Sequence, residues 1–159
     1  MRLLDELKDL LKREHVLARD GSGTPADLEV QAATALLLLE AAHGDEEYAW
    51  HEHRAIVKGL RRAFGLGRSD VRRLLERAEE IRPPMVRLAD ITEVVRERYD
   101  EAQRLEIVRL LWRVVEADGS VQEWENAFTT HVAETLGIPE ASVQATRTQT
   151  TDGEPATDG

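Results

Sequence analysis

The hydrophobic residues of the chain recur mostly at intervals of three and four, the spacing of an amphipathic α-helix. No segment alternates apolar and polar residues in the way that a strand would. Between breaks rich in Gly, Pro, Asp and Ser, the pattern predicts helices over residues 26–42, 48–64, 70–81, 85–98, 100–117, 121–136 and 139–146. Together with an N-terminal helix, this predicts an all-α fold of about seven to eight helices.

Two of the expected helices contain largely apolar stretches, Ala32–Ala42 and Leu105–Val115. A helix that is apolar nearly all round is buried, so we expect these two to pack together at the centre of the domain. Trp112 lies in the second stretch and is a candidate core residue. Helix starts are expected at Thr24-Pro25 and at Ser69, because a hydroxyl side chain is a favourable N-cap.

The two ends of the chain differ from the middle. Residues 1–20 are predicted to form an N-terminal amphipathic helix, and its apolar face, with Leu3, Leu7 and Leu10, is expected to pack on the domain or to bind a protein partner. Residues 24–146 form the predicted helical domain. Residues 147–159 contain no apolar side chain that could anchor them, so we expect this tail to be disordered.

Composition and charge narrow the function classes. The chain has 159 residues and a formal net charge of −10, which repels phosphate backbones, so we expect no nucleic-acid partner. No apolar run approaches the roughly 20 residues that cross a bilayer, and the N-terminus does not resemble a secretory signal. We therefore expect a cytoplasmic protein without stable membrane insertion. The absence of cysteine excludes disulfides, thiolate metal sites and thiol nucleophiles.

Residues 35–66 and 107–138 are similar to each other. In each stretch, a buried helix leads into a short acidic turn and then into a second helix that ends at a glycine. When Asp45 is aligned with Asp118, Glu52 aligns with Glu125, so the pattern Asp-x6-Glu occurs twice. The repeats extend over about residues 32–78 and 105–146 and predict a pseudo-twofold domain with its two acidic turns in corresponding positions.

The second copy resembles the TerB-like family, named for tellurite-resistance protein B. The resemblance rests on Leu110-Leu111-Trp112, Glu116-Ala117-Asp118-Gly119, Glu125 and Leu136-Gly137-Ile138. The first copy departs from the family pattern, because Glu46 stands where the family usually has glycine and His43-Gly44 precede Asp45. The resemblance implies an all-helical, internally duplicated domain with a role in bacterial stress responses to tellurite and other toxic insults, and acidic residues implicated in divalent-metal binding.

The two Asp-x6-Glu turns are candidate cation sites, because turn and helix carboxylates with nearby carbonyl oxygens suit Ca²⁺, Mg²⁺ or Mn²⁺. The candidate ligands are Asp45, Glu52, Asp118 and Glu125. In the alternative interpretation these acids are structural: each Asp caps the next helix, and each Glu favours the positive end of its dipole. Zn²⁺ with His43, Asp45 and His51 is a further alternative, although the metalloprotease spacing H-E-x-x-H is absent.

Arginines cluster in the middle of the chain, at positions 61, 62, 68, 72, 73 and 77. Asp70, Glu76, Glu79 and Glu80 are interleaved with them, which favours i,i+4 ion pairs along a helix over a site for anions. No serine-nucleophile or phosphate-binding glycine motif is present, so we do not expect an enzyme.

Three functions remain open at this point. The sequence favours a TerB-like adaptor or sensor that binds divalent cations at its two acidic turns. The first alternative is a purely structural protein-interaction module in which the acids are helix caps. A metal-dependent hydrolase is a more distant alternative.

Overall fold

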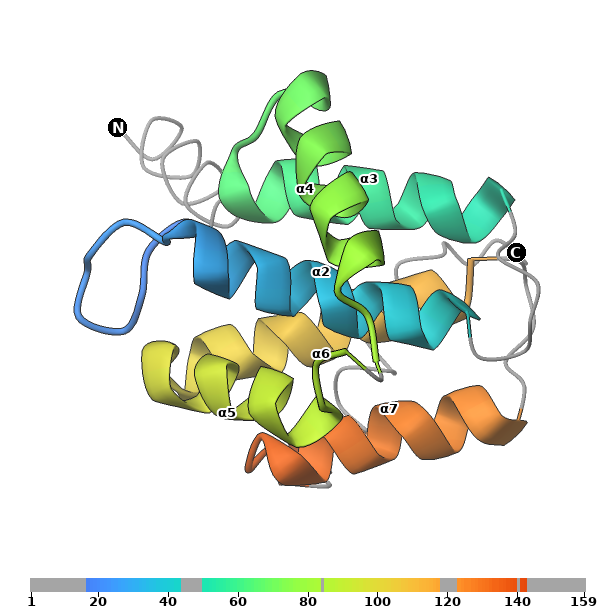
Figure 1. Ribbon diagram of the computed structural model, residues 1–159. Helices are drawn as coiled ribbons and strands as arrows, with labels where there is room; N and C mark the ends of the chain where they lie inside the picture. Colours follow the sequence, from blue (N-terminus) through green and yellow to red (C-terminus); the bar gives the residue numbers. More distant parts are fainter. Residues whose placement is uncertain (1–16, 44–49, 84, 118–122, 140, 143–159) are drawn as a thin grey trace, which may run out of the picture.

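The computed structural model describes residues 17–43, 50–83, 85–117, 123–139 and 141–142. Within these residues all regular structure is helical, apart from one isolated bridge between Arg19 and Pro25. The helices are α2 (Leu28–His43), α3 (Trp50–Phe64), α4 (Arg68–Glu80), α5 (Leu88–Arg98), α6 (Glu101–Val115) and α7 (Glu123–Thr135) (Figure 1). The predicted all-α class is confirmed.

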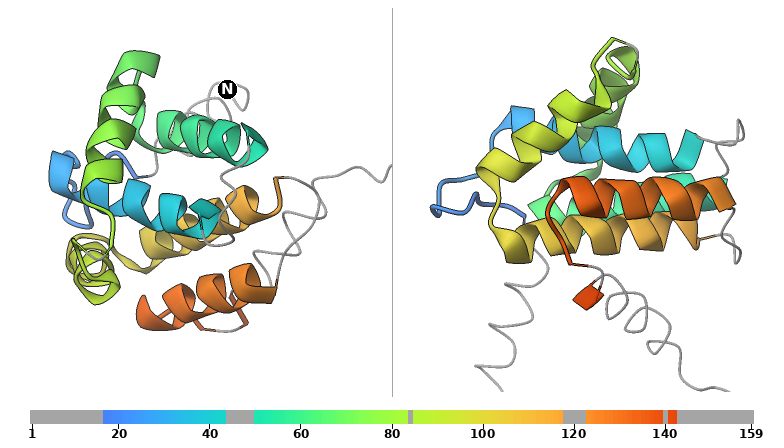
Figure 2. Two further views of the ribbon diagram at one scale, coloured as in Figure 1. Left: turned by 45° about the vertical axis from the view of Figure 1, so that its right-hand side comes forward. Right: turned by 90° about the horizontal axis from the view of Figure 1, so that it is seen from below.

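Helix α2 lies at the centre of the fold, with the other helices arranged around it (Figures 1 and 2). It contacts α3, α4, α5, α6 and α7. Its sequence explains this position, because the run Ala35–Leu39 is buried on every side and leaves the middle of the helix without a polar face. Helix α6, the second largely apolar helix, contacts α2, α3 and α7. The expected packing of these two helices against each other is confirmed.

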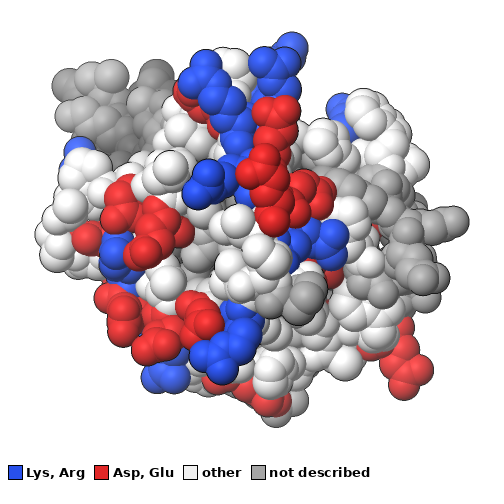
Figure 3. All heavy atoms as spheres, viewed as in Figure 1, with Lys and Arg blue, Asp and Glu red and all other residues white. Residues whose placement is uncertain are grey.

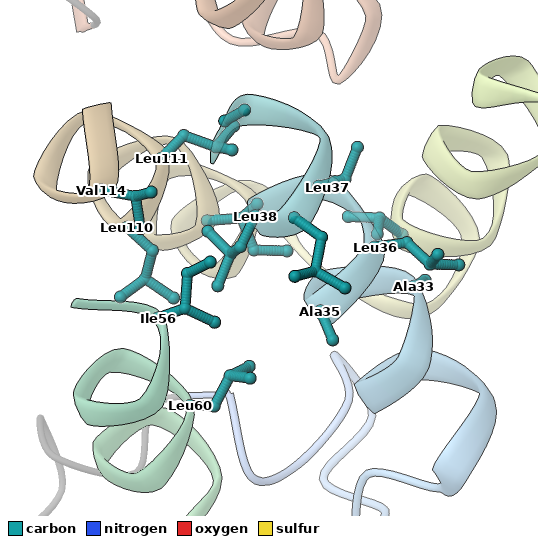
Figure 4. Packing of buried hydrophobic residues seen from close by; sticks show 14 of the residues in the cluster. Ala33, Ala35, Leu36, Leu37, Leu38, Ile56, Leu60, Leu110, Leu111 and Val114 are labelled. Atoms are coloured by element: carbon teal, nitrogen blue, oxygen red, sulfur yellow. The ribbon is translucent and has the colours of Figure 1, made fainter. Parts of the chain in front are cut away.

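Figure 4 shows the core where α2, α3 and α6 meet. Leu38, Ile56 and Leu111, one from each helix, have no exposed surface. A Cβ atom on Gly59 would lie 3.1 Å from the Leu110 side chain, so glycine at this position allows α3 to approach α6 closely. Trp112 on α6 is only 1% exposed, as predicted.

The starts of two helices differ from the prediction. Helix α2 begins at Leu28 instead of near Thr24-Pro25, and the Asp27 carboxylate accepts a hydrogen bond of 3.0 Å from the Val30 backbone N–H. Thr24 is held in a loop, because its own N–H donates to the Asp20 carboxylate. Helix α4 begins at Arg68 with Gly67 as N-cap, so Ser69 lies inside the first turn and does not cap the helix.

Helix α6 begins with a capping box. The Asp100 side chain accepts from the Gln103 N–H, and the Gln103 side chain accepts from the Asp100 N–H. These reciprocal bonds satisfy two donors that would otherwise have no partner in the helix, and they fix the entry into the central helix.

Helices α3 and α7 end in the same way. Gly65 and Gly137 have φ values of 69° and 76°, a left-handed conformation that favours glycine. The N–H of the next residue, Leu66 or Ile138, donates to a carbonyl five residues earlier. Both helices therefore end in the hydrogen-bonding pattern of a Schellman motif.

The segment before α2 is tied to the domain. The Leu17 N–H donates to the Ala63 carbonyl at 3.1 Å, and the Tyr99 hydroxyl donates to the Leu17 carbonyl at 2.7 Å. Residues 17–20 lie in a turn and a bridge and not in the helix expected over residues 1–20. The rest of that expected helix, with its predicted partner-binding residues Leu3, Leu7 and Leu10, lies outside the described residues, as does the tail 147–159.

Among the described residues, no helix combines the length and the apolar character needed to span a membrane.

Candidate cation site

The structure describes two of the four predicted cation ligands, and both are buried. Glu52 is the third residue of α3 and is 3% exposed. Glu125 is the third residue of α7 and is 2% exposed. A carboxylate is seldom this deeply buried unless charged or hydrogen-bonding groups compensate for its lost hydration. Both glutamates therefore require such groups beside them.

The other two predicted ligands, Asp45 and Asp118, lie in segments 44–49 and 118–122, outside the described residues. No group of three His, Asp or Glu side chains in the described part of the chain is placed to hold a metal ion. The structure therefore places one carboxylate of each predicted pair, and the pairing itself stays a prediction.

The helix ends that border the two acidic turns gather at one end of the molecule (Figures 1 and 2). These are the C-terminal ends of α2 and α6 and the N-terminal ends of α3 and α7. The N-terminal ends place Glu52 and Glu125 where the positive end of a helix dipole favours a carboxylate. The C-terminal ends supply carbonyl oxygens, the kind of hard ligand that completes a site for a divalent cation.

Histidine ligation of Zn²⁺ receives little support from the described residues. The His43 Nε2 atom lies 3.1 Å from a carboxylate oxygen of Glu79 on α4. His51 is exposed on α3, whereas Asp45 is not described. The zinc site with Asp45 therefore stays a prediction.

A network of charged groups beside His43 could not be read from the sequence. Arg82 donates through Nε to the Glu40 carboxylate at 2.6 Å, and its Nη1 atom lies 3.6 Å from Glu79. These contacts join the C-terminal part of α2 to the end of α4 across about forty positions of sequence. They replace the i,i+4 pairs that the sequence suggested along α4, which are absent from the ion pairs of the described residues.

A second unforeseen feature is the half-buried Glu106 on α6. Burial raises the pKa of its carboxyl above the ordinary value, while Arg113 and Arg109 on the same helix act in the opposite direction. Its nearest ion-pair contact is 3.4 Å, from Arg109 Nη1. The sequence shows the spacing of these three residues, but only the fold shows that the carboxylate is shielded from water.

Comparison with known proteins agrees with the helical architecture. A protein of unknown function from Porphyromonas gingivalis W83, known from its crystal structure, superposes with a TM-score of 0.62 at 16% sequence identity. The match covers 80% of this chain and 97% of that chain, and at this identity it shows a shared fold. No curated protein matches the chain. The family described as tellurite resistance protein TerB matches residues 31–148, which include both buried glutamates. The chain belongs to the TerB family.

Proposed function

We propose that this protein is a non-enzymatic adaptor or sensor domain of the TerB type, acting in stress responses, that binds divalent cations at its two Asp-x6-Glu turns. The observation that carries the proposal is the burial of Glu52 and Glu125 at the same position of two helices. Each glutamate follows an aspartate by seven residues, and the family match includes both pairs.

The physical reason is the chemistry of the ligands. Oxygen ligands from a turn and a helix start suit Ca²⁺, Mg²⁺ or Mn²⁺. Asp45 and Asp118 would supply the second carboxylate of each site. With two such sites at one end of the molecule, cation binding would alter the conformation of the helix ends that surround the sites.

We also propose that the domain is internally duplicated, with about seven to eight helices in the whole chain. Helices α2 and α3 would correspond to α6 and α7. Their shared features support this: both pairs begin with a buried, largely apolar helix, and both end in a glycine of positive φ. Duplication would make the two acidic turns equivalent sites.

A structural role is the competing interpretation. Glu52 and Glu125 are the third residues of their helices, where the positive end of the helix dipole favours a carboxylate. Under this interpretation, the acids stabilise the helix starts and bind no cation.

Calorimetric titration with Ca²⁺, Mg²⁺ and Mn²⁺, together with thermal melting, separates the two roles. We expect the wild type to bind at least one of these ions and to gain about 2.7 kcal/mol of stability per occupied site at a free concentration of 100 times Kd. The variant with Glu52→Gln and Glu125→Gln should lose this response. A matched control, Glu93→Gln with Glu134→Gln, removes two exposed acids and should keep it.

Chelator supplies the second comparison. Without a cation, the ligand carboxylates repel each other, so the Glu52→Gln and Glu125→Gln variant should be as stable as the wild type or more stable. Capping instead predicts a loss of a few tenths to about 1 kcal/mol per helix, with or without cation. A wild-type melting curve that no divalent ion changes would show the cation proposal to be wrong.

A further inference from the structure

The outward surface of α3 is basic from Arg54 to Arg62, although the protein has a net charge of −10. Its exposed side chains include Trp50, His51, Arg54, Lys58, Arg61 and Arg62, which we call the α3 basic face. The only acid in this helix is Glu52, and it is buried on the opposite side. The face therefore carries positive charge that its own helix does not neutralise.

The geometry of this face follows from helical spacing. Trp50, Arg54, Lys58 and Arg61 succeed one another at intervals of four, four and three, so they form one row. The Arg54 guanidinium lies over the Trp50 ring, with its Cζ atom 5.4 Å from the ring centroid. The indole is nevertheless 64% exposed, so most of a large apolar surface stays open to solvent.

An open groove of about 980 Å³ runs beside this row. Among the described residues that line it, no acid is present, and Val57, Leu66 and Ala117 supply apolar surface. The lining of the groove thus combines apolar and basic side chains. A peptide that carries both apolar and acidic side chains would match this lining.

Two bases of the row contact neutral groups in the described part of the protein: Arg54 lies over the Trp50 ring, and the Arg61 Nε donates to the Leu66 carbonyl at 3.4 Å. Arg54, Lys58 and Arg61 take part in none of the ion pairs found among these residues, whereas Arg87 pairs with Asp90 and Arg98 pairs with Asp27. Helix α4 differs in carrying acids among its arginines: Figure 3 shows basic side chains toward its N-terminal end and acidic ones toward its C-terminal end. The α3 basic face therefore offers a negatively charged partner a row of bases without exposed acids on the same helix.

We propose that the α3 basic face is a docking surface for an acidic protein segment, with Trp50 as its apolar anchor. Tryptophan and arginine are the residues that most often dominate binding energy at protein interfaces. The inference rests on the adaptor part of the proposed function and does not require cation binding. From Trp50 to Arg62 the face extends about 18 Å, which accommodates about twelve residues of a helical segment.

An acidic protein segment fits this surface better than nucleic acid. The protein is acidic overall, so a polyanion extending beyond the face would meet repulsion, and a short acidic segment would not. Nucleic-acid affinity also grows with the number of phosphates that lysine and arginine neutralise, and this row offers only a few such side chains.

Fluorescence anisotropy with three labelled probes tests the proposal. The first is a twelve-residue peptide of glutamates with leucines at helical spacing, the second has glutamine at each glutamate, and the third is a twelve-nucleotide oligothymidylate. We expect the wild-type protein to bind the glutamate peptide saturably, at least about tenfold more tightly than the other two, and more weakly as salt is raised.

Two charge-reversal variants make the comparison specific. Arg54→Glu with Lys58→Glu should weaken binding of the glutamate peptide by about tenfold or more. The control, Arg72→Glu with Arg73→Glu, changes the net charge equally on exposed residues of α4 and should alter binding by less than about twofold. Trp50→Ala should weaken binding while leaving its salt dependence unchanged, because the indole contributes apolar contact and not charge.

Several results would overturn the proposal. These are no saturable binding of the glutamate peptide, equal binding of the glutamine peptide, tighter binding of the oligothymidylate, or equal losses in the two charge-reversal variants. Circular dichroism establishes that each variant is folded. Repeating the titrations in chelator separates this proposal from the previous one, because docking should persist even if the acidic turns bind no cation.

Discussion

Replacement of Trp112 by alanine tests the central position of α6. The side chain is 1% exposed, and it lies in a helix that contacts α2, α3 and α7. Truncation of a buried tryptophan removes its transfer free energy and leaves a cavity, which together cost about 3–5 kcal/mol. Domains of this size are stable by about 5–15 kcal/mol, so the variant should lose a large fraction of its free energy of unfolding.

The chain contains its own control for this experiment. Trp50→Ala makes the same chemical change at a side chain that is 64% exposed, and it should alter stability by no more than about 0.5 kcal/mol. Urea unfolding is best followed by far-UV circular dichroism, because both substitutions remove a fluorophore. A loss below about 1 kcal/mol for Trp112→Ala, or equal losses in the two variants, would refute the assignment of α6 to the core.

Two further substitutions probe single contacts. Tyr99→Phe removes the buried hydroxyl that donates to the Leu17 carbonyl. The carbonyl is then left unsatisfied, which should lower the free energy of unfolding in urea by about 1–3 kcal/mol. An unchanged midpoint would show that this hydrogen bond does not hold the N-terminal segment. Glu106→Gln tests the carboxyl whose pKa is raised by burial. A raised folded-state pKa contributes stability at low pH that is lost as the pH rises through that value. The free energy of unfolding of the variant should therefore increase relative to that of the wild type from about pH 4 upward. If it decreases instead as the pH rises, the ion pairs of Glu106 with Arg109 and Arg113 outweigh the cost of burying the carboxylate.

The sequence predicted where helices lie better than where they begin. Apolar spacing identifies the interior of a helix because burial of one face, or of the whole helix in α2, requires it. A helix start depends on a few competing hydrogen bonds. Thr24 and Asp27 are both good caps by residue type, but the Asp20 carboxylate holds Thr24 in a loop and leaves Asp27 to accept from Val30.

The candidate cation site could be predicted in part because the chain repeats a pattern. The Asp-x6-Glu spacing identifies Glu52 and Glu125 as candidate ligands. The structure shows that both glutamates are buried and that both helix starts lie at one end of the molecule. Burial of these carboxylates could not be inferred from the sequence, since glutamate is usually exposed and nothing around either residue marks an exception.

The α3 basic face could not be predicted, because clustering in sequence and clustering in space differ for helices. The sequence grouped Arg61 and Arg62 with the arginines of residues 68–77, where interleaved acids reduce the apparent charge. The glycine at position 65 ends α3 between the two groups, so they belong to different helices. On α3 the only acid points into the protein, and the bases at intervals of three and four share the outer side. The charge of a surface therefore depends on which face of a helix each charged residue lies on. The apolar residues determine those faces, because they bury the opposite side of the helix.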